Sequence, residues 1–582
     1  MSNEQKTPAE LYREERKERI AKASKKSAKK ALRAPRSANA GKIISIILVV
    51  AIALAACWGI LDYTGVIQRT ISVGKAGGES VSIAEYNYYY MQSFTRIYET
   101  ARQYESNYAS SYGAGVGKQY TGFDYTIAPD KQEYPTQMQT EDMPITALDG
   151  GNATWADYFR ISALTLAGNV NHFHDLAVEA GITLGEDDKT QIEDTIKSMR
   201  DAATEGNYSL NRFLTVQCGD GVNENLYKSL ITRQQLAALY YEKIEADKAA
   251  EVSEDAINAK YAEDPSAYDT IDFKFFTMQY KDPAEASQAT EGTSAEAETT
   301  TLPTSADALK QMNEMLSKVT TSEEFRALAY TYAPEASKKN YETDDGVFAR
   351  SITKSSVSSM PKDASDWLFS SERAAGDKIV INDEDNDAIF LFLMVTPVHR
   401  DDTVSVSVRH ILFKYPTTTD EEGNTVDATD AAKAETLKKA QDMLASFNTN
   451  PSEDAFATLA KDNTEDTGSK ENGGLYENIY PGEMVYEFDK WSFDPARKPG
   501  DTAIVTTVHG YHIMYFSATG TESSWHSTIK TSLADEAFNT YITEASKTIF
   551  SEFDKREWLI TRRANSLNQF IKMGFYSSTT TV

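Results

Sequence analysis

Histidine, carboxylate and large apolar side chains recur in residues 404–520 in an order that could support chemistry. Val406–Lys414 (VSVRHILFK) alternates as a strand does, so Val406, Val408, His410 and Leu412 share one face. Three later segments carry the other candidates: Glu465-Asp466-Thr-Gly-Ser, Pro481-Gly-Glu-Met484-Val-Tyr-Glu-Phe488 and Gly510-Tyr-His512-Ile. Histidine and carboxylate groups can hydrogen-bond to a reacting group, while an apolar pair can hold a substrate ring.

Other reaction classes lack their motifs in this sequence. There is no Gly-x-Ser-x-Gly elbow, no His-Glu-x-x-His and no glycine-rich phosphate loop, and no Cys-His signature surrounds Cys218. Each candidate alone also has a plain structural interpretation. A single strand histidine is more often structural than catalytic, and Met484 and Phe488, four residues apart, could be core on a helix face. The order of the whole set therefore carries the functional hypothesis.

The elements that must position these residues form an α+β unit that occurs twice. In residues 404–520 a strand is followed by a helix with Leu437, Ala440 and Leu444 on one side, a second helix from Phe456, and a closing strand. Residues 271–400 repeat that order. Ile271-Asp-Phe-Lys-Phe-Phe parallels Val406-Ser-Val-Arg-His-Ile, and Asp366-Trp-Leu-Phe parallels Lys490-Trp-Ser-Phe. A low-complexity insert, residues 283–305, interrupts the first copy.

The motifs of the second copy resemble those of the parvulin family of peptidyl-prolyl cis-trans isomerases. In order they are RHILF, F-A-x-L-A-K-x-x-x-E-D-x-G-S, GG, PGEMVxxF and GYHI. The flanking helical regions resemble the PrsA and SurA foldases, in which a parvulin domain is inserted into a helical chaperone domain. The resemblance implies an α+β fold class with a helical chaperone part (66–262), a degenerate parvulin-like domain, a parvulin domain, and C-terminal helices (521–575) that pack on the chaperone part.

The resemblance also assigns roles to individual residues. It implies a catalytic polar centre of His410, Asp466 and His512, and a proline pocket of Met484 and Phe488. Tyr476 and His509 are expected to bind substrate as well, and both lie where this chain departs from the family. Leu-Tyr476-Glu replaces the usual Asp-Leu-Gly after Gly473-Gly474, and His509 stands where serine, threonine or tyrosine is common.

The implied reaction needs neither a cofactor nor a metal ion. Rotation about an X-Pro bond makes and breaks no covalent bond, and its barrier of about 18–20 kcal/mol reflects lost amide resonance. The first copy aligns Phe275 with His410, Glu335 with Asp466, Ala364 with Phe488 and Ala388 with His512, so we expect it to lack catalysis and to bind peptide or act as a spacer. The competing hypothesis is a holdase, in which the helical domain binds unfolded chains and the parvulin domain adds little.

Charge and hydropathy predict the location and the partners. Ile43–Leu61 is uncharged over 19 residues, enough to span a bilayer. Residues 1–42 carry 13 Lys and Arg against 5 Asp and Glu, which predicts a cytoplasmic N-terminus, an anchor at residues 43–62 and an extracytoplasmic body. Leu54-Ala-Ala-Cys57 also resembles a lipoprotein cleavage site, so anchoring by a lipidated Cys57 stays open.

The predicted partners are unfolded secreted polypeptides that contain X-Pro bonds, the membrane, and a second copy of this chain in a homodimer suggested by the family resemblance. The net charge of −28 disfavours nucleic acid as a partner.

Overall fold

The computed structural model describes residues 15–19, 21–22, 50, 52–53, 55–57, 59–140, 144–147, 150–281, 302–419, 425–426, 428–549 and 551–553. By internal contacts the chain forms two units, the first of residues 1–244 and 539–582 and the second of residues 245–538. Unit 2 is thus inserted into the sequence of unit 1. Within the ranges given, no helix is both long and apolar enough to cross a bilayer. Much of the predicted anchor Ile43–Leu61, including residues 43–49, lies outside those ranges.

Unit 1 contains a small antiparallel sheet in the order β13-β1-β2. Strands β1 (Ser72–Ala76) and β2 (Glu79–Ser82) form a hairpin around Gly77-Gly78, as the alternation of residues 71–83 around this glycine pair predicts. Strand β13 (Ser551–Phe553) pairs with the other edge of β1. The expectation of helices throughout 521–575 is therefore wrong at this point. A strand forms because its backbone groups pair with the otherwise open edge of β1.

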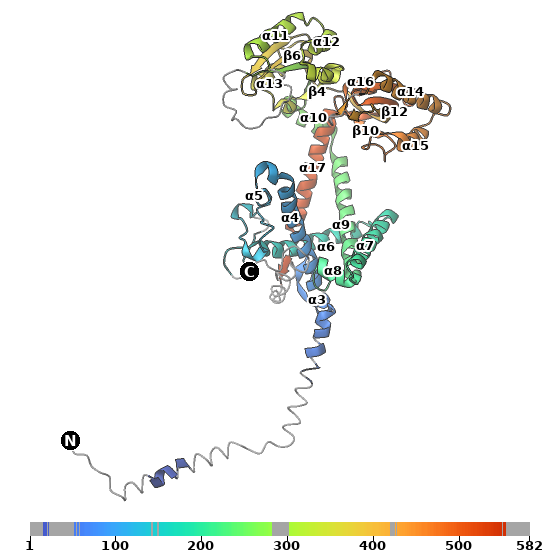
Figure 1. The fold of residues 1–582 in the computed structure, drawn as a ribbon. Helices are drawn as coiled ribbons and strands as arrows, with labels where there is room; N and C mark the ends of the chain where they lie inside the picture. The colour runs from blue at the N-terminus through green and yellow to red at the C-terminus, as the bar shows by residue number, and fades with distance from the viewer. Residues whose placement is uncertain are drawn as a thin grey trace, which may run out of the picture. The chain divides into compact units, whose positions relative to one another are not determined.

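Helices make up much of unit 1, and those after Thr154 follow the helical apolar spacing of the sequence. They are α3 (Val66–Thr70), α4 (Ile83–Tyr112), α6 (Trp155–Glu179), α7 (Glu186–Glu205), α8 (Leu210–Cys218) and α9 (Glu224–Glu251). Helices α4 and α6 pack directly on each other (Figure 1). Both begin at a capping box, with Ser82 and Thr154 as the caps. Tyr86, Tyr89 and Phe94 on α4 are buried in the same cluster as Phe159, which Phe94 contacts edge-on, so these aromatic side chains are core.

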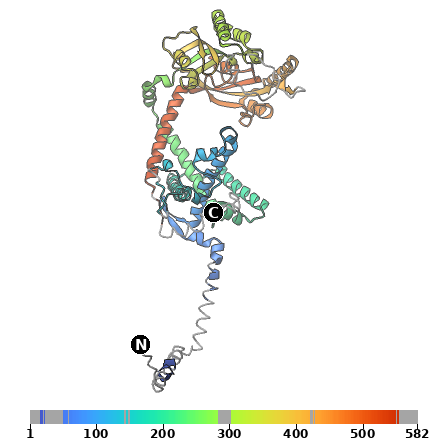
Figure 2. The same ribbon diagram turned by 60° about the vertical axis from the view of Figure 1, so that its left-hand side comes forward.

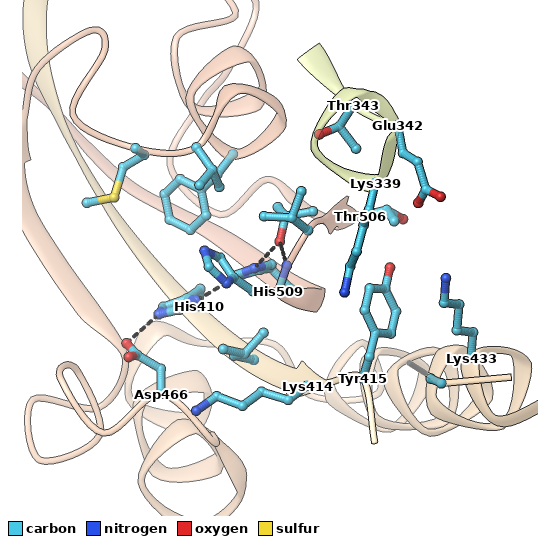
Figure 3. A pocket seen from close by; sticks show the side chains of 18 of the residues that line it. Lys339, Glu342, Thr343, His410, Lys414, Tyr415, Lys433, Asp466, Thr506 and His509 are labelled. Atoms are coloured by element: carbon cyan, nitrogen blue, oxygen red, sulfur yellow. Dashed lines mark hydrogen bonds and ion pairs between the residues drawn. The ribbon is translucent and has the colours of Figure 1, made fainter. Parts of the chain in front are cut away.

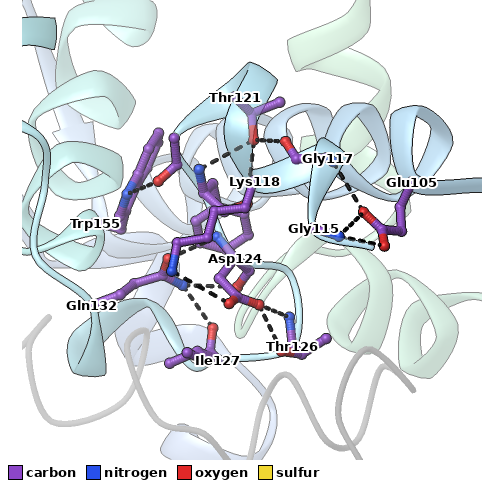
Figure 4. Close-up of polar contacts among 12 residues, drawn as sticks. Glu105, Gly115, Gly117, Lys118, Thr121, Asp124, Thr126, Ile127, Gln132 and Trp155 are labelled. Carbon is purple, nitrogen blue, oxygen red and sulfur yellow. Dashed lines mark hydrogen bonds and ion pairs between the residues drawn. The ribbon is translucent and has the colours of Figure 1, made fainter. Parts of the chain in front are cut away.

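The segment 107–150 is rich in Ser, Gly, Tyr and Pro, a composition that predicts a long loop, but it contains more regular structure than that. Helix α4 continues to Tyr112, and a short helix α5 (Val116–Thr121) follows. Figure 4 shows why this segment is ordered: the Glu105 carboxylate accepts hydrogen bonds from the N–H groups of Gly115 and Gly117. Nearby, the Trp155 indole donates to the Gly122 carbonyl (3.2 Å). Side chains from two long helices thus form hydrogen bonds with backbone groups of this segment. In the loop that the composition predicts, those groups would bond to water instead.

Unit 2 contains two four-stranded antiparallel sheets of one topology. The first copy has β3 (Thr270–Gln279), β4 (Phe348–Thr353), β5 (Lys378–Asp383) and β6 (Ala388–His399) in the order β4-β3-β6-β5. Helices α11 (Ser305–Lys318) and α12 (Ser322–Tyr332) cover one face, and α13 (Lys362–Leu368) covers the other. Helix α10 (Glu254–Glu263) precedes this copy in sequence.

The second copy has β7 (Val404–Lys414), β10 (Leu475–Ile479), β11 (Thr502–Thr507) and β12 (Gly510–Ser523) in the order β10-β7-β12-β11. Helices α14 (Asp430–Phe447) and α15 (Glu453–Asn463) cover one face, and α16 (Tyr486–Ser492) covers the other. Helix α17 (Ser524–Lys547) leads the chain out of this copy. The two copies lie side by side, the first in green to yellow and the second in orange (Figures 1 and 2).

The copies also share an irregular detail of their second strands. Asn478 in β10 and Ser351 in β4 both have a φ of 54°, each at a register shift against the neighbouring strand. The N–H of Asn478 donates to the Ser407 hydroxyl, and the N–H of Ser351 donates to the Asp272 carboxylate. In both copies the bulge lies at the same place, and a side-chain oxygen of the neighbouring strand accepts its N–H. The repeat in the sequence is therefore matched in the structure down to this irregular detail.

Strand register corrects one pairing between the copies. Lys414 lies opposite Gly510 in the second copy, and Gln279 lies opposite Ala388 in the first. Ala388 therefore corresponds to Gly510, and the counterpart of His512 is Phe390. The sequence alignment was wrong by two residues because the β5–β6 turn is two residues longer than the β11–β12 turn. The first copy thus has Phe275 and Phe390 where the second has two histidines.

Candidate active site

All seven residues predicted for the site line one pocket of about 800 Å³ in unit 2. They are His410, Asp466, Tyr476, Met484, Phe488, His509 and His512. Strand β7 supplies His410 and β12 supplies His512, while Asp466 follows α15 and Tyr476 lies on β10. Phe488 lies in the first turn of α16, and Met484 lies just before that helix. Five separate elements therefore converge on the pocket (Figure 3).

An aromatic ring joins the apolar and polar parts of this pocket. The Phe488 ring stands edge-on to the rings of His410 and His512, with centroid distances of 5.5 and 5.6 Å. The two imidazole rings lie edge to edge and nearly parallel, with their centroids 5.1 Å apart. Leu412 and Val485 extend the apolar lining beside Met484. A ring-shaped apolar group can therefore enter next to the histidine pair without burying an unpaired polar atom.

A continuous hydrogen-bond chain runs through the polar part. Asp466 Oδ2 lies 3.0 Å from His410 Nε2, and His410 Nδ1 lies 2.9 Å from His512 Nδ1. His512 Nε2 in turn lies 2.9 Å from Thr507 Oγ1, which accepts from the N–H of His509 at 3.1 Å. Part of this chain is visible in Figure 3.

The direction of the chain follows from its two ends. Asp466 is a carboxylate and only accepts, so His410 donates through Nε2–H and must accept at Nδ1. His512 therefore donates through Nδ1–H and accepts at Nε2 from the Thr507 hydroxyl. These tautomers are assigned from the network. All four ring nitrogens are occupied, so neither imidazole keeps an N–H to offer to a substrate.

The electrostatics agree with a neutral His512 beside an ionised Asp466. Hydrogen bonds from His410, Ser469 and Tyr476 hold the pKa of Asp466 far below its usual value, against the opposing effect of partial burial. Burial lowers the pKa of His512 to about 3, and the neighbouring His410 and His509 act in the same direction. Burial and the bond to Asp466 raise the pKa of Tyr476 to about 12, so its phenol stays a donor.

Tyr476 and His509 take different places in the pocket. The Tyr476 hydroxyl donates to Asp466 at 3.0 Å and so belongs to the polar cluster. His509 joins that cluster through its main-chain N–H, while its side chain lines the pocket. In the ranges that the structure covers, no group of three or more His, Cys, Asp or Glu side chains is arranged to hold a metal ion.

Several residues of the polar cluster and of the pocket were not singled out from the sequence. Ser469 donates to Asp466 and contacts His410 Nε2 at 3.1 Å; it closes the E-D-x-G-S motif, which was the available signal. Thr507 precedes the β11–β12 turn and had no local signal. Lys339, Glu342 and Thr343 come from the first copy, so only the tertiary structure places them in this pocket.

Comparison with known proteins gives this domain a family. Residues 392–518 match the family model described as the PPIC-type PPIASE domain. Foldase protein PrsA 1 of Listeria innocua is 39% identical over 59 residues, which is 10% of this chain and 20% of that protein. Foldase protein PrsA 2 of Listeria monocytogenes is 36% identical over 70 residues, 12% of this chain and 24% of that protein. The matches therefore span about a quarter or less of these relatives.

Solved structures of similar proteins include PrsA from Streptococcus pneumoniae, with 13% identity and a TM-score of 0.19 over 69% of this chain and 89% of that one. PrsA from Bacillus anthracis has 15% identity and a TM-score of 0.16 over 53% of this chain and 94% of that one. These scores are too low to support a conclusion about the whole chain. The family match and the PrsA relatives identify residues 392–518 as a parvulin-type, PPIC-type peptidyl-prolyl isomerase domain.

Proposed function

We propose that this protein is a cofactor-independent peptidyl-prolyl cis-trans isomerase that assists the folding of polypeptides containing X-Pro bonds. The observation that carries the proposal is the meeting, in one pocket, of an apolar surface and a closed hydrogen-bond cluster, in a domain of the PPIC type. Met484 and Phe488 are the proposed proline pocket, with Tyr476 and His509 as further contacts. His410, Asp466 and His512 are the proposed polar centre.

The geometry suggests how the barrier is lowered. A planar amide is stabilised by resonance and is strongly polar, whereas the twisted amide has lost that resonance. A largely apolar pocket that fits the ring and excludes water therefore favours the twisted form relative to the planar one. Every nitrogen of the two imidazoles is already hydrogen-bonded within the cluster. The histidines therefore act by fixing the shape of the pocket wall and the electrostatic field in the pocket. No proton transfer to the substrate is required.

The test follows cis-to-trans relaxation of a short X-Pro peptide with the full chain. Asp466→Ala leaves three side-chain donors without their acceptor, and Met484→Ala removes part of the apolar lining. We expect each to reduce kcat/KM at least tenfold, equivalent to about 1.4 kcal/mol. The controls are Asp462→Ala, an exposed carboxylate of α15, and Met443→Ala, a methionine on the opposite face of the domain. Relaxation no faster than the uncatalysed rate would refute the isomerase and leave the holdase.

The location outside the membrane is part of the proposal. It rests on the uncharged run Ile43–Leu61 behind a basic segment, which suits a single-pass anchor with a cytoplasmic N-terminus. Alkaline extraction of membranes tests it: an integral anchor stays in the pellet, also when Cys57 is changed to Ala. Release of the Cys57→Ala variant would instead establish a lipid anchor. The predicted homodimer is tested on the detergent-solubilised chain by sedimentation.

A further inference from the structure

The isomerase pocket has a wall that its own domain does not supply. Lys339, at the end of a short 3-10 helix of the first copy (Glu335–Tyr341), and the neighbouring Glu342 and Thr343 line it together with the second copy. Figure 3 shows these three side chains on a segment facing Tyr415 and Lys433 across the cleft. The copy that has lost both histidines is therefore still part of the surface that a substrate would meet.

A buried ion pair ties the two copies together directly behind the proline pocket. Asp489 on α16 is 2% exposed, and it accepts from the guanidinium of Arg350 on β4 of the first copy. Its other oxygen accepts from the N–H of Gly482 at 2.9 Å. The Arg350 guanidinium also lies 5.4 Å above the Phe493 ring. A carboxylate this deeply buried needs a fixed cation, because removal of the partner leaves an uncompensated charge.

Two further contacts from the first copy hold the start of α16. The N-cap residue Val485 provides no side-chain cap, and instead the Asp345 carboxylate accepts from the N–H of Tyr486. The ring of Phe348 packs edge-on to Tyr486 at 5.1 Å. A cap of this kind satisfies a donor that the helix cannot satisfy itself. The first turn of α16 is thus completed by a carboxylate from outside its own domain.

The preceding turn is wedged against the same strand. Gly482 has a φ of 86°, and a Cβ at this position would lie 2.2 Å from the Arg350 carbonyl oxygen. Any other residue here would push the first copy away from the turn. The segment Pro481–Asp489 is therefore fixed on one side by β4 of the first copy, and this segment carries both Met484 and Phe488.

We propose that the first copy is a working part of the isomerase site, in which Arg350 and Asp345 are positioning residues for Met484 and Phe488 and the Lys339–Thr343 segment contacts the polypeptide beside the proline. This inference rests on the proposed isomerase function. It explains how a copy without the histidine pair contributes to the site. Strand β4 of the first copy supports the segment that carries Met484 and Phe488, and residues 335–343 form part of the pocket wall.

The decisive variants are Arg350→Ala and Arg350→Lys in the full chain. Arg350→Ala should lower kcat/KM for a short X-Pro peptide at least tenfold, and Arg350→Lys, which keeps a cation near Asp489, should recover at least a third of the wild-type value. Arg373→Ala is the matched control and should stay within twofold of wild type. Arg373 has similar exposure, pairs with Asp377 and lies over the Trp367 ring, but all three residues belong to the first copy.

Hydrogen exchange separates positioning from unfolding. In Arg350→Ala the amides of residues 482–489 should exchange at least tenfold faster, while those of β3 and β12 keep their protection. Asp345→Ala provides a second, independent route to the same acceleration at Tyr486. If Arg350→Ala instead unfolds the first copy, the amides of β3 lose protection. The inference is then tested by Asp345→Ala alone, through the exchange at Tyr486 and kcat/KM on the short peptide.

The substrate wall has its own readout. Lys339→Ala should slow the proline-limited refolding of a whole protein several-fold, and by a larger factor than it slows the relaxation of a four-residue X-Pro peptide, because the longer chain makes more contacts with that segment. An active wild type with Arg350→Ala and Asp345→Ala both at the wild-type rate would overturn the inference and leave the isomerase proposal standing. An inactive wild type would refute the isomerase proposal itself, and the inference with it.

Discussion

Thr507 is the residue on which the assigned tautomer of His512 depends. Thr507 is 2% exposed, and its hydroxyl donates to His512 Nε2. The Nδ1–H of His512 is then available to donate to His410. Thr507→Val keeps the shape and removes the donor, so a buried acceptor loses its partner, at a cost of about 1–3 kcal/mol in the free energy of unfolding. We expect kcat/KM on an X-Pro peptide to fall several-fold. Thr506→Val, an exposed neighbour, is the control, and equal rates for both variants would contradict the assigned chain.

The neutral state of His512 predicts a pH dependence of stability. Above pH 6.5 the residue is uncharged in both the folded and the unfolded chain. Below that pH His512 binds a proton in the unfolded chain, whereas in the folded chain it stays neutral down to about pH 3. The free energy of unfolding therefore falls as the pH falls. Between pH 6.5 and pH 5 the expected loss is about 2 kcal/mol. Asp466 changes the free energy of unfolding only when the pH falls to its ordinary pKa or lower, which is below the range from pH 6.5 to pH 5.

Native-state hydrogen exchange of β12 amides, corrected for intrinsic rates, measures this loss. His512→Asn should remove most of the slope between pH 6.5 and pH 5, because asparagine does not titrate. A variant with the wild-type slope would place the responsible proton on another group.

At this scale the sequence predicted the members of the pocket better than their connections. The order of motifs was enough to select His410, Asp466 and His512, because the residue types are specific. Thr507 could not be found in this way, since its role depends on a two-residue turn that folds its hydroxyl back onto β12. The same turn, shorter than its counterpart in the first copy, led to the incorrect pairing of His512 with Ala388.

Among the elements, the position of β10 depends on the backbone conformation of the glycine that precedes it. Gly474 has a φ of 72°, and a Cβ there would lie 2.2 Å from the His410 carbonyl oxygen. Gly474→Ala must therefore move β10 away from β7, and with it the hydroxyl of Tyr476. Gly500→Ala is a matched control, because Gly500 has a φ of 95° with open space around it.

We expect Gly500→Ala to cost about 1–2 kcal/mol of unfolding free energy, the conformational penalty alone. Gly474→Ala should cost more and should also reduce kcat/KM at least tenfold. Urea denaturation and the peptide assay measure both quantities. Equal stability losses in the two variants would mean that the close approach to His410 is relieved without moving β10.

The elements themselves were largely predictable where one hydrophobic period extends over a long segment. The apolar spacing of the sequence predicts helices over residues 161–180, 187–204 and 226–248. Helices α6, α7 and α9 match these ranges to within a few residues, apart from the earlier start of α6, because apolar spacing and caps are local signals. Short strands such as β13 were not predictable. Three residues carry no period of their own, and they become a strand only because β1 offers them an open edge.

On the scale of the whole molecule, the chain leaves unit 1 after residue 244 and returns to it at residue 539. The return is completed by β13, whose Phe553 packs edge-on to Tyr86 at 6.2 Å and lies under the Arg160 guanidinium at 5.2 Å. An insertion of this kind lets one unit lose stability without the other, provided that their cores are separate. The buried clusters of the two units share no residue.

Phe553→Ala tests this independence. Because the ring is only partly buried, we expect a loss of about 2 kcal/mol, less than the 3–5 kcal/mol typical of a fully buried phenylalanine. Exchange of the β1 amides of Lys75 and Ala76 should accelerate accordingly, while β12 amides and the rate on a short X-Pro peptide remain at wild-type values. Glu552→Ala, on the exposed side of the same strand, is the control. A parallel loss of protection in β12 would mean that both units unfold as one cooperative body, and the isomerase domain would then depend on the C-terminal strand for its stability.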